Sequence, residues 1–190
     1  MGGASRFSSK NATMGAALAL ITGAAFSGIA HGAETQAAGW ASKEVSFTYQ
    51  GFTTKYSCDG LHDKVRAVLL KLGARKDDLK VRRSGCTSGS GTPDPFPGVS
   101  IKAMVLQPAG ADEKSPVQAE WQAVEFRASP TAALDRGDCE LVEQLRDKVL
   151  PIFTTRNVEV LNNCVPHQMT AGGMMLKLDV LKAKPEKTSK

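Results

Sequence analysis

The residues best suited to chemistry lie near the C-terminus, in residues 163–178, "NCVPHQMTAGGMMLKL". Cys164 precedes His167 by three residues, and three methionines follow, Met169, Met174 and Met175. A type-1 copper site takes two histidines, a cysteine thiolate and a weak axial methionine. The order of residue types therefore raises the hypothesis of a copper site. The rival hypothesis is that Cys164 forms half of a disulfide.

The segment "CVPHQ" resembles the ligand loop of plastocyanin, but the second histidine ligand of that family has no match here. No histidine occurs between His62 and His167, and His62 lies in a segment with helical spacing. A simpler Cu(I) site would need only His167 and thioether ligands from Met169, Met174 or Met175, because soft thioethers suit that ion. A periplasmic copper-handling protein therefore stays open as an alternative.

The N-terminal residues 1–33 have the layout of a secretory signal peptide. Arg6 and Lys10 form a positive region, the apolar run "MGAALALITGAAFSGIA" follows, and small residues precede Ala33. We expect cleavage before Ala33, with Glu34 as the alternative position, and a periplasmic or secreted product. The rival hypothesis is that the apolar run is retained as a membrane anchor. The remainder is expected to form one α+β domain, 34–182, followed by a disordered tail, 183–190, and it has no apolar run long enough to cross a membrane.

The charge balance is mildly basic. The chain has 24 basic and 19 acidic residues, and loss of Arg6 and Lys10 would leave 22 against 19, or about +3. Such an excess is too small to indicate specific nucleic-acid binding. The densest basic run is "RKDDLKVRR", in which Arg82 and Arg83 should point to opposite faces of a strand. Both a solvated surface and contact with an anionic cell-surface component are compatible with this run.

Two halves of the chain, about 45–107 and 117–182, have the same predicted order of strand, helix, strand and strand. The stretch "GVSIKAMVLQ" aligns without a gap with "GMMLKLDVLK". Each predicted helix begins near a cysteine, Cys58 or Cys139, and the following strand ends near another, Cys86 or Cys164. Four cysteines in an exported chain favour two disulfides, and this arrangement predicts the pairs Cys58–Cys86 and Cys139–Cys164.

The fold class expected from these patterns is α+β, with two pseudo-repeated β-α-β-β units. The helices should cover one face of an antiparallel or mixed sheet, and each unit should carry one disulfide. Asp59 and Asp138 are placed to cap the two helices, and Gly73 is placed to end the first.

Catalytic motifs are sparse in the sequence. It contains no G-x-S-x-G, no H-E-x-x-H and no glycine-rich phosphate loop. The remaining candidates are His62 beside Asp63, and an acidic cluster whose simpler interpretation is a helix start. That cluster consists of Asp135, Asp138, Glu140 and Glu143. We therefore expect no catalytic residues and no cofactor, with an enzyme as the second alternative.

Residues 56–86, "YSCDGLHDKVRAVLLKLGA…GC", resemble exported bacterial proteins of uncharacterised function in which a Tyr-Ser-Cys-Asp start and a later Gly-Cys frame a helix. The resemblance implies export and two cysteine pairs, and it implies no activity. Together, these features predict an exported, non-catalytic binding or structural module of the cell envelope, whose partner is an envelope protein or an anionic surface component.

Overall fold

The strands and helices of the described residues all belong to the unit Gly32–Lys190. The computed structural model describes residues 34–89, 91–111, 113–127, 133–162 and 174–184, together with Val165. The elements, in chain order, are β1 (Thr35–Thr48), α1 (Cys58–Lys71), η1 (Lys76–Asp78), β2 (Lys80–Ser84), β3 (Gly98–Pro108), β4 (Val117–Arg127), α2 (Cys139–Gln144), η2 (Leu145–Val149), η3 (Leu150–Ile152), β5 (Thr155–Asn162) and β6 (Met174–Ala183).

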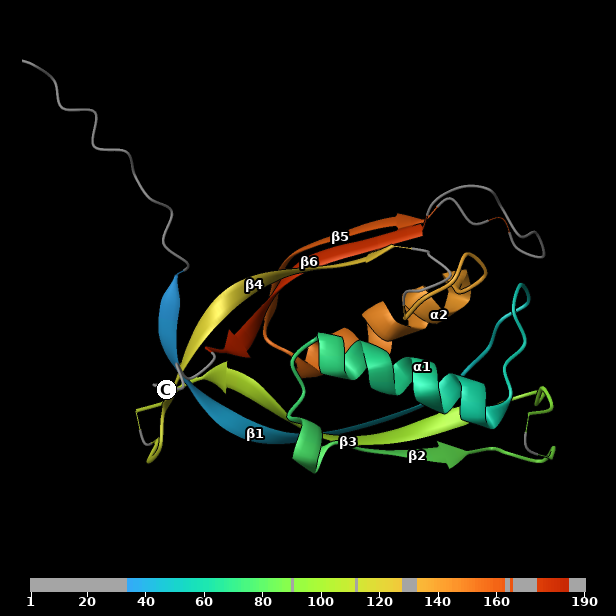
Figure 1. Cartoon of the computed structure of the whole chain (residues 1–190), viewed down its shortest axis with the longest axis horizontal. Coiled ribbons are helices and arrows are strands. Elements are labelled where there is room, and N and C mark those ends of the chain that lie inside the picture. Colours follow the sequence, from blue (N-terminus) through green and yellow to red (C-terminus); the bar gives the residue numbers. More distant parts are fainter. Residues whose placement is uncertain are drawn as a thin grey trace, which may run out of the picture. The chain divides into compact units, whose positions relative to one another are not determined.

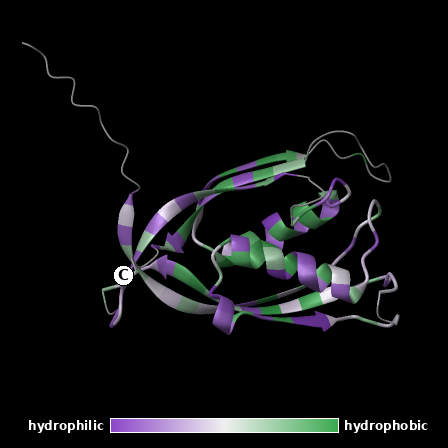
Figure 2. Ribbon diagram, viewed as in Figure 1, coloured by the Kyte–Doolittle hydropathy of each residue, from purple (hydrophilic) through white to green (hydrophobic). Residues whose placement is uncertain are grey.

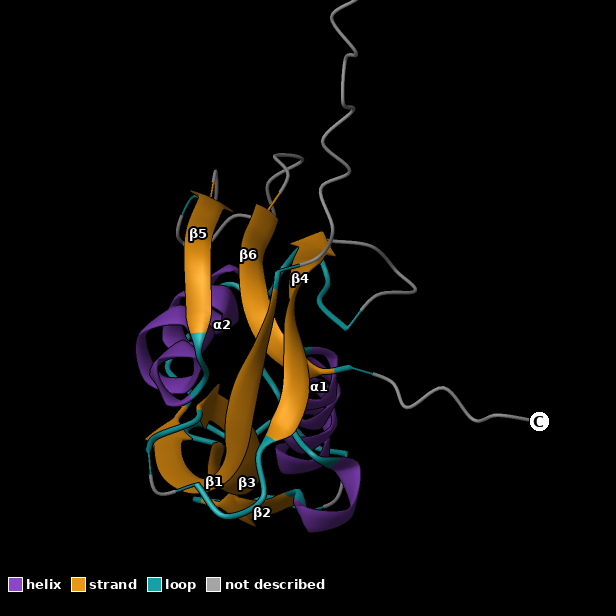
Figure 3. Cartoon of the chain, turned by 90° about the vertical axis from the view of Figure 1, so that its left-hand side faces the viewer, coloured by secondary structure: helices purple, strands orange, loops and turns teal. Residues whose placement is uncertain are grey.

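All six strands form one sheet in the order β2-β3-β1-β4-β6-β5, and every neighbouring pair is antiparallel. β1 pairs with β3 from Ala38 to Thr48, while its first residues, Thr35 to Ala38, pair with β4. The sheet therefore has two wings, β2-β3-β1 and β4-β6-β5, joined at the start of β1. α1 and α2 lie between the wings, against the inner face of the sheet (Figures 1 and 3).

The core lies between the two helices and the inner face of the sheet. Strand side chains alternate between buried and exposed, so that hydrophobic and hydrophilic bands follow one another along the strands in Figure 2. α1 contributes apolar residues at helical spacing, as its sequence predicts. The inward residues of β3, β6, α1 and the C-cap of α1 are Val99, Ile101, Ala103, Val105, Met174, Leu176, Leu178, Val180, Leu61, Val65, Val68, Leu69 and Leu72.

A second, smaller apolar cluster lies on the opposite face, where the wings join. It consists of Ala38, Leu106, Ala119 and Leu181, with Trp40, Val117 and Trp121 packed against it. The Arg75 guanidinium lies 5.6 Å from the Trp40 ring centre, and the Arg156 guanidinium lies 4.3 Å from that of Trp121. These cation–π contacts shield the indole rings from water.

The ends of α1 follow from local chemistry. Ser57 is the N-cap, and its side-chain oxygen accepts a hydrogen bond from the Gly60 N–H at 3.1 Å. The prediction that Asp59 caps the helix is therefore wrong, since Asp59 lies in the first turn. Gly73 follows the helix with a φ of 95°, a conformation that glycine adopts without strain.

The second helical segment is shorter and less regular. α2 has six α-helical residues, followed by a π-helical turn at η2 and a 3₁₀ turn at η3 that contains Pro151. Asp138 occupies the N-cap position but makes no capping hydrogen bond with its side chain. Its carboxylate is used in another contact, described below.

The prediction of two repeated β-α-β-β units carrying two disulfides is wrong. The strands merge into a single six-stranded antiparallel sheet, because β1 pairs with a strand from each half of the chain. The two helical segments also differ, since α1 is a regular 14-residue α-helix and α2 is not. The Cys58–Cys86 disulfide forms as predicted, and it is the one disulfide for which both cysteines lie within the described ranges. The broader prediction of an α+β protein is confirmed.

Several predictions fall outside the described residues: the signal peptide at 1–33, most of the polar tail, and Cys164, His167 and Met169. Cys139 is buried and disulfide-bonded. Because Cys164 is not described, the pair Cys139–Cys164 stays a prediction. Within the described ranges, no helix combines the length and the apolar character that crossing a bilayer requires.

Replacing both Cys58 and Cys86 by serine should lower the free energy of unfolding by about 3–4 kcal/mol, because the disulfide closes a loop of 28 residues. Urea unfolding under oxidising conditions measures this loss. The control is the same comparison with a thiol reductant present, where the wild type and the double variant should have nearly equal stability. A difference that persists after reduction would mean that the serines themselves disturb the fold.

Candidate functional site

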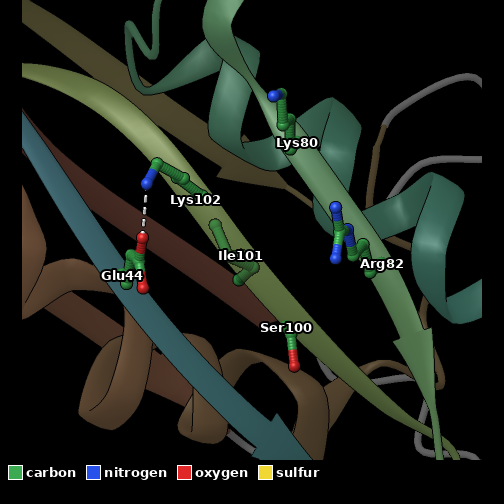
Figure 4. A pocket seen from close by; sticks show the side chains of 6 residues that line it. All are labelled: Glu44, Lys80, Arg82, Ser100, Ile101 and Lys102. Atoms are coloured by element: carbon green, nitrogen blue, oxygen red, sulfur yellow. Dashed lines mark hydrogen bonds and ion pairs between the residues drawn. The ribbon is translucent and has the colours of Figure 1, made fainter.

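The outer face of the β2-β3-β1 wing carries a group of exposed polar side chains, which we call the basic face. Lys80 and Arg82 come from β2, Ser100 and Lys102 from β3, and Glu44 from β1. They line a hollow of about 370 Å³ (Figure 4). They share one face because strand residues two positions apart point the same way.

Strand register brings these residues together. Lys80 is directly opposite Lys102, Arg82 is opposite Ser100, and Lys102 is opposite Glu44. The Lys102 Nζ lies 2.7 Å from Glu44 Oε1, as the dashed line in Figure 4 marks. The hydrogen bond and the charge of Lys102 hold the pKa of Glu44 below its usual value. This pair is exposed, so its contribution to stability is small.

The basic face has more positive than negative charge. Glu44 compensates Lys102, while neither Lys80 nor Arg82 has an ion-pair partner among the described residues. Like charges directly opposite each other destabilise an antiparallel pair. The repulsion between Lys80 and Lys102 therefore lowers the stability of the β2–β3 pairing. Charges on an edge strand such as β2 can prevent unwanted strand pairing. That explanation does not extend to Lys102, because β3 is an interior strand.

Arg82 and Arg83 point to opposite faces, as the alternation predicts. The Arg83 guanidinium forms an ion pair with Asp59 on α1, whereas Arg82 lines the outer hollow. The basic run is visible in the sequence, but Ser100, Lys102 and Glu44, which join Arg82 on the outer face, lie outside it. Only the pairing of β1, β3 and β2 reveals that association, and no local sequence signal contains it.

Asp135 and Asp138 of the predicted acidic cluster connect the start of α2 to α1 and to the loop that precedes α1. Asp138 has an exposed fraction of 1%, and its Oδ2 lies 2.8 Å from the Lys64 Nζ. The Tyr56 hydroxyl donates to the other oxygen of Asp138, and the Asp135 N–H donates to Oδ2 at 2.6 Å. The Lys64 Nζ also lies 2.5 Å from Asp135 Oδ2. Burial lowers the pKa of Lys64, but the hydrogen bonds and charges of both aspartates outweigh burial and raise it.

The other acids of the cluster do not join Asp135 and Asp138 in one site. Glu140 Oε1 accepts hydrogen bonds from the Phe52 and Thr53 N–H groups and from the Thr53 hydroxyl. It therefore fastens the β1–α1 loop to the start of α2, and these hydrogen bonds lower its pKa against the effect of burial. Glu143 is exposed on α2. The carboxylates of Asp135, Asp138 and Glu140 thus accept hydrogen bonds from Lys64 and from backbone N–H groups, and they do not converge on one metal site.

The other candidates are dispersed. His62 Nδ1 lies 2.8 Å from Asp63 Oδ1 on the exposed side of α1. Met174 is buried in the core, whereas Met175 lies on the opposite face of β6. The two methionines therefore lie on different sides of the sheet, and His167 lies outside the described residues.

One group of potential metal ligands occurs within the described ranges, Cys58, Cys86 and Asp94. The sulfurs of Cys58 and Cys86 are joined in the disulfide. Oδ1 of Asp94 accepts hydrogen bonds from the backbone of Thr87 and Ser88. These residues are therefore engaged in holding the β2–β3 loop.

No protein family model, curated protein or solved structure matches this chain. The site must therefore be interpreted from its own geometry. Of the candidate groups in the described chain, the basic face is the one that presents uncompensated charge to solvent.

The two tyrosines of the chain, Tyr49 and Tyr56, generate a pH prediction. Both are buried, with ring centres 4.8 Å apart. Burial, and then the nearby carboxylates, raise the pKa of each phenol well above its ordinary value. In the unfolded chain both phenols should ionise near pH 10. Above that pH the unfolded state binds fewer protons than the folded state, so the free energy of unfolding should fall by up to about 1.4 kcal/mol per pH unit for each tyrosine.

Absorbance at the tyrosinate band, followed together with circular dichroism during alkaline titration, tests this prediction. The folded protein should show no tyrosinate signal until it unfolds, and both signals should then change together. The variant Tyr49→Phe retains Tyr56 and serves as the single-site comparison. Tyrosinate absorbance that appears near the ordinary pKa while the protein stays folded would contradict the buried hydrogen bond from Tyr56 to Asp138.

Proposed function

We propose that this protein is an exported, non-catalytic binding module that holds a polyanionic component of the cell envelope on its basic face. The observation that carries the proposal is the placement of Lys80 directly opposite Lys102, with Arg82 beside them and Glu44 as the one acid among the residues that line the hollow. A bound anion would relieve the repulsion between the two ammonium groups, and so would convert a local cost into binding affinity.

The side chains of the basic face suit phosphate, sulfate or carboxylate groups. A lysine ammonium provides a mobile point charge, whereas the arginine guanidinium offers paired donors that match two oxygens of one anion. Ser100 is directly opposite Arg82 on the neighbouring strand, and its hydroxyl can donate a further hydrogen bond. Because these groups lie on an open sheet face, a repeating anion fits the arrangement better than an enclosed small molecule does.

Export is supported by the predicted signal peptide at 1–33 and by the resemblance of residues 56–86 to exported bacterial proteins. The Cys58–Cys86 disulfide is also typical of proteins in oxidising compartments. We therefore assign the mature protein to the periplasm or the extracellular space. A non-catalytic role is supported by the structural use of Asp135, Asp138 and Glu140 described above.

Charge reversal on the basic face tests the proposal. The double variant Lys80→Glu/Arg82→Glu should weaken binding to inorganic polyphosphate at least about tenfold at low ionic strength, because two cations become anions. The matched control Lys148→Glu/Arg136→Glu makes the same change in net charge on exposed residues outside this face. It should retain most of the affinity. Isothermal titration at two salt concentrations provides both the affinity and its salt dependence.

Equal losses in the two double variants would show that binding reflects net charge alone, and would contradict a site on the basic face. Because β2 is an edge strand, the substitutions could also promote association between molecules. Light scattering therefore accompanies the titration. The neutral pair Lys80→Gln/Arg82→Gln should give an intermediate affinity, which association alone would not produce.

A further inference from the structure

A large apolar side chain projects into solvent near the basic face. Phe96 has an exposed fraction of 63% and lies in the β2–β3 loop, just before β3. Single exposed apolar side chains are common on protein surfaces, so the exposure of Phe96 alone indicates no contact. What distinguishes Phe96 is its place in the loop that leads into β3, one of the strands that carry the basic face.

The loop that presents Phe96 is held at several points. The flanking Pro95 and Pro97 each fix one backbone angle, and the Tyr49 N–H donates to the Pro97 carbonyl at 2.8 Å. Asp94 accepts hydrogen bonds from the Thr87 N–H at 2.8 Å and the Ser88 N–H at 2.7 Å.

The Cys58–Cys86 disulfide ties the other end of the β2–β3 loop to α1. A close backbone approach adds to this restraint. A Cβ at Gly85 would lie 2.5 Å from the Phe96 carbonyl oxygen. The two backbone segments can therefore approach this closely only because residue 85 is glycine. The exposure of Phe96 is therefore built into the structure of the loop.

Phe96 lies just before β3, beyond the end of the strand that carries Ser100 and Lys102. Lys102 and Ser100 point outward from β3, while Ile101 and Val99 point into the core. The contact between Tyr49 and Pro97 continues the β1–β3 ladder beyond Gly98. Pro97, the residue before β3, is buried, and Phe96 is exposed. Phe96 is four positions before Ser100 in the chain, in the bend that leads into β3.

We infer that the basic face docks on an anionic lipid bilayer, with Phe96 inserted between the headgroups. This inference rests on the proposed function and specifies its partner. Cations attracted to anionic headgroups, combined with a protruding aromatic ring, give a reversible peripheral contact. A soluble polyanion would use Lys80, Arg82 and Lys102 but would leave the phenyl ring in water. The exposed ring beside the cations of the basic face therefore favours the bilayer.

Phe52 provides a matched control for Phe96. Its exposed fraction is 64%, nearly the same as that of Phe96. It lies in the β1–α1 loop, where its N–H donates to Glu140 at the start of α2, on the helical side of the sheet. Removal of the Phe52 ring therefore changes the exposed apolar area by a similar amount without changing the basic face.

Co-sedimentation with vesicles tests the inference. Vesicles of phosphatidylcholine mixed with phosphatidylglycerol should bind the protein, and vesicles of phosphatidylcholine alone should bind it much more weakly. Phe96→Ala should weaken binding to the anionic vesicles about tenfold, whereas Phe52→Ala should leave it nearly unchanged. Phe96→Leu should retain most of the binding, because it keeps a large apolar side chain. Polyphosphate binding by Phe96→Ala should equal that of the wild type, which also shows that the variant is folded.

The outcomes separate the two proposals. If the wild type binds polyphosphate but not anionic vesicles, the bilayer inference is wrong and the basic face serves a soluble polyanion. Equal losses for Phe96→Ala and Phe52→Ala would also overturn the inference, since binding would then follow apolar area at any position. Failure to bind either polyphosphate or vesicles would overturn both the inference and the proposed function.

Discussion

The register of β1 against β3 is the constraint on which the rest of the structure depends. It places Val45 and Ile101 opposite each other on the inner face, and Glu44 opposite Lys102 on the outer face. A slip of one residue would exchange the two faces, moving charge into the core and apolar side chains into water. The core therefore fixes the register, and the register in turn assembles the basic face. The proposed binding surface is thus a consequence of the pairing that builds the hydrophobic core.

The sequence predicts the local elements better than it predicts their association. Apolar alternation places β3 and β6 within a residue or two, and helical spacing places the buried face of α1. The early part of β1 is missed, because its alanines and glycine give no strand pattern. The expected repeat of two separate units is wrong, because β1 joins strands from both halves of the chain into one sheet. Lys102 could not be assigned to a site, because its neighbours Lys80 and Glu44 come from strands far apart in the chain.

Acidic and basic side chains have different roles in this fold. Asp138, Glu140 and Asp94 act within the structure, where their carboxylates fasten loops to helices or hold a loop to itself. The cations of the basic face have no comparable structural contact among the described residues, apart from the exposed pair of Lys102 with Glu44. The disulfide and the Asp94 hydrogen bonds hold the loop that carries Phe96. Rigid presentation reduces the ordering cost of binding, and so it favours a preformed contact surface.

The most direct test of the central claim is a backbone amide NMR titration of the folded protein with short-chain polyphosphate. The account predicts that chemical-shift changes concentrate on β2, β3 and the facing part of β1, with the largest changes near Lys80, Arg82 and Lys102. Residues of α2 and the outer face of β5 should change little. Changes that concentrate elsewhere, or that spread evenly over all exposed lysines and arginines, would contradict the assignment of the basic face as the binding site.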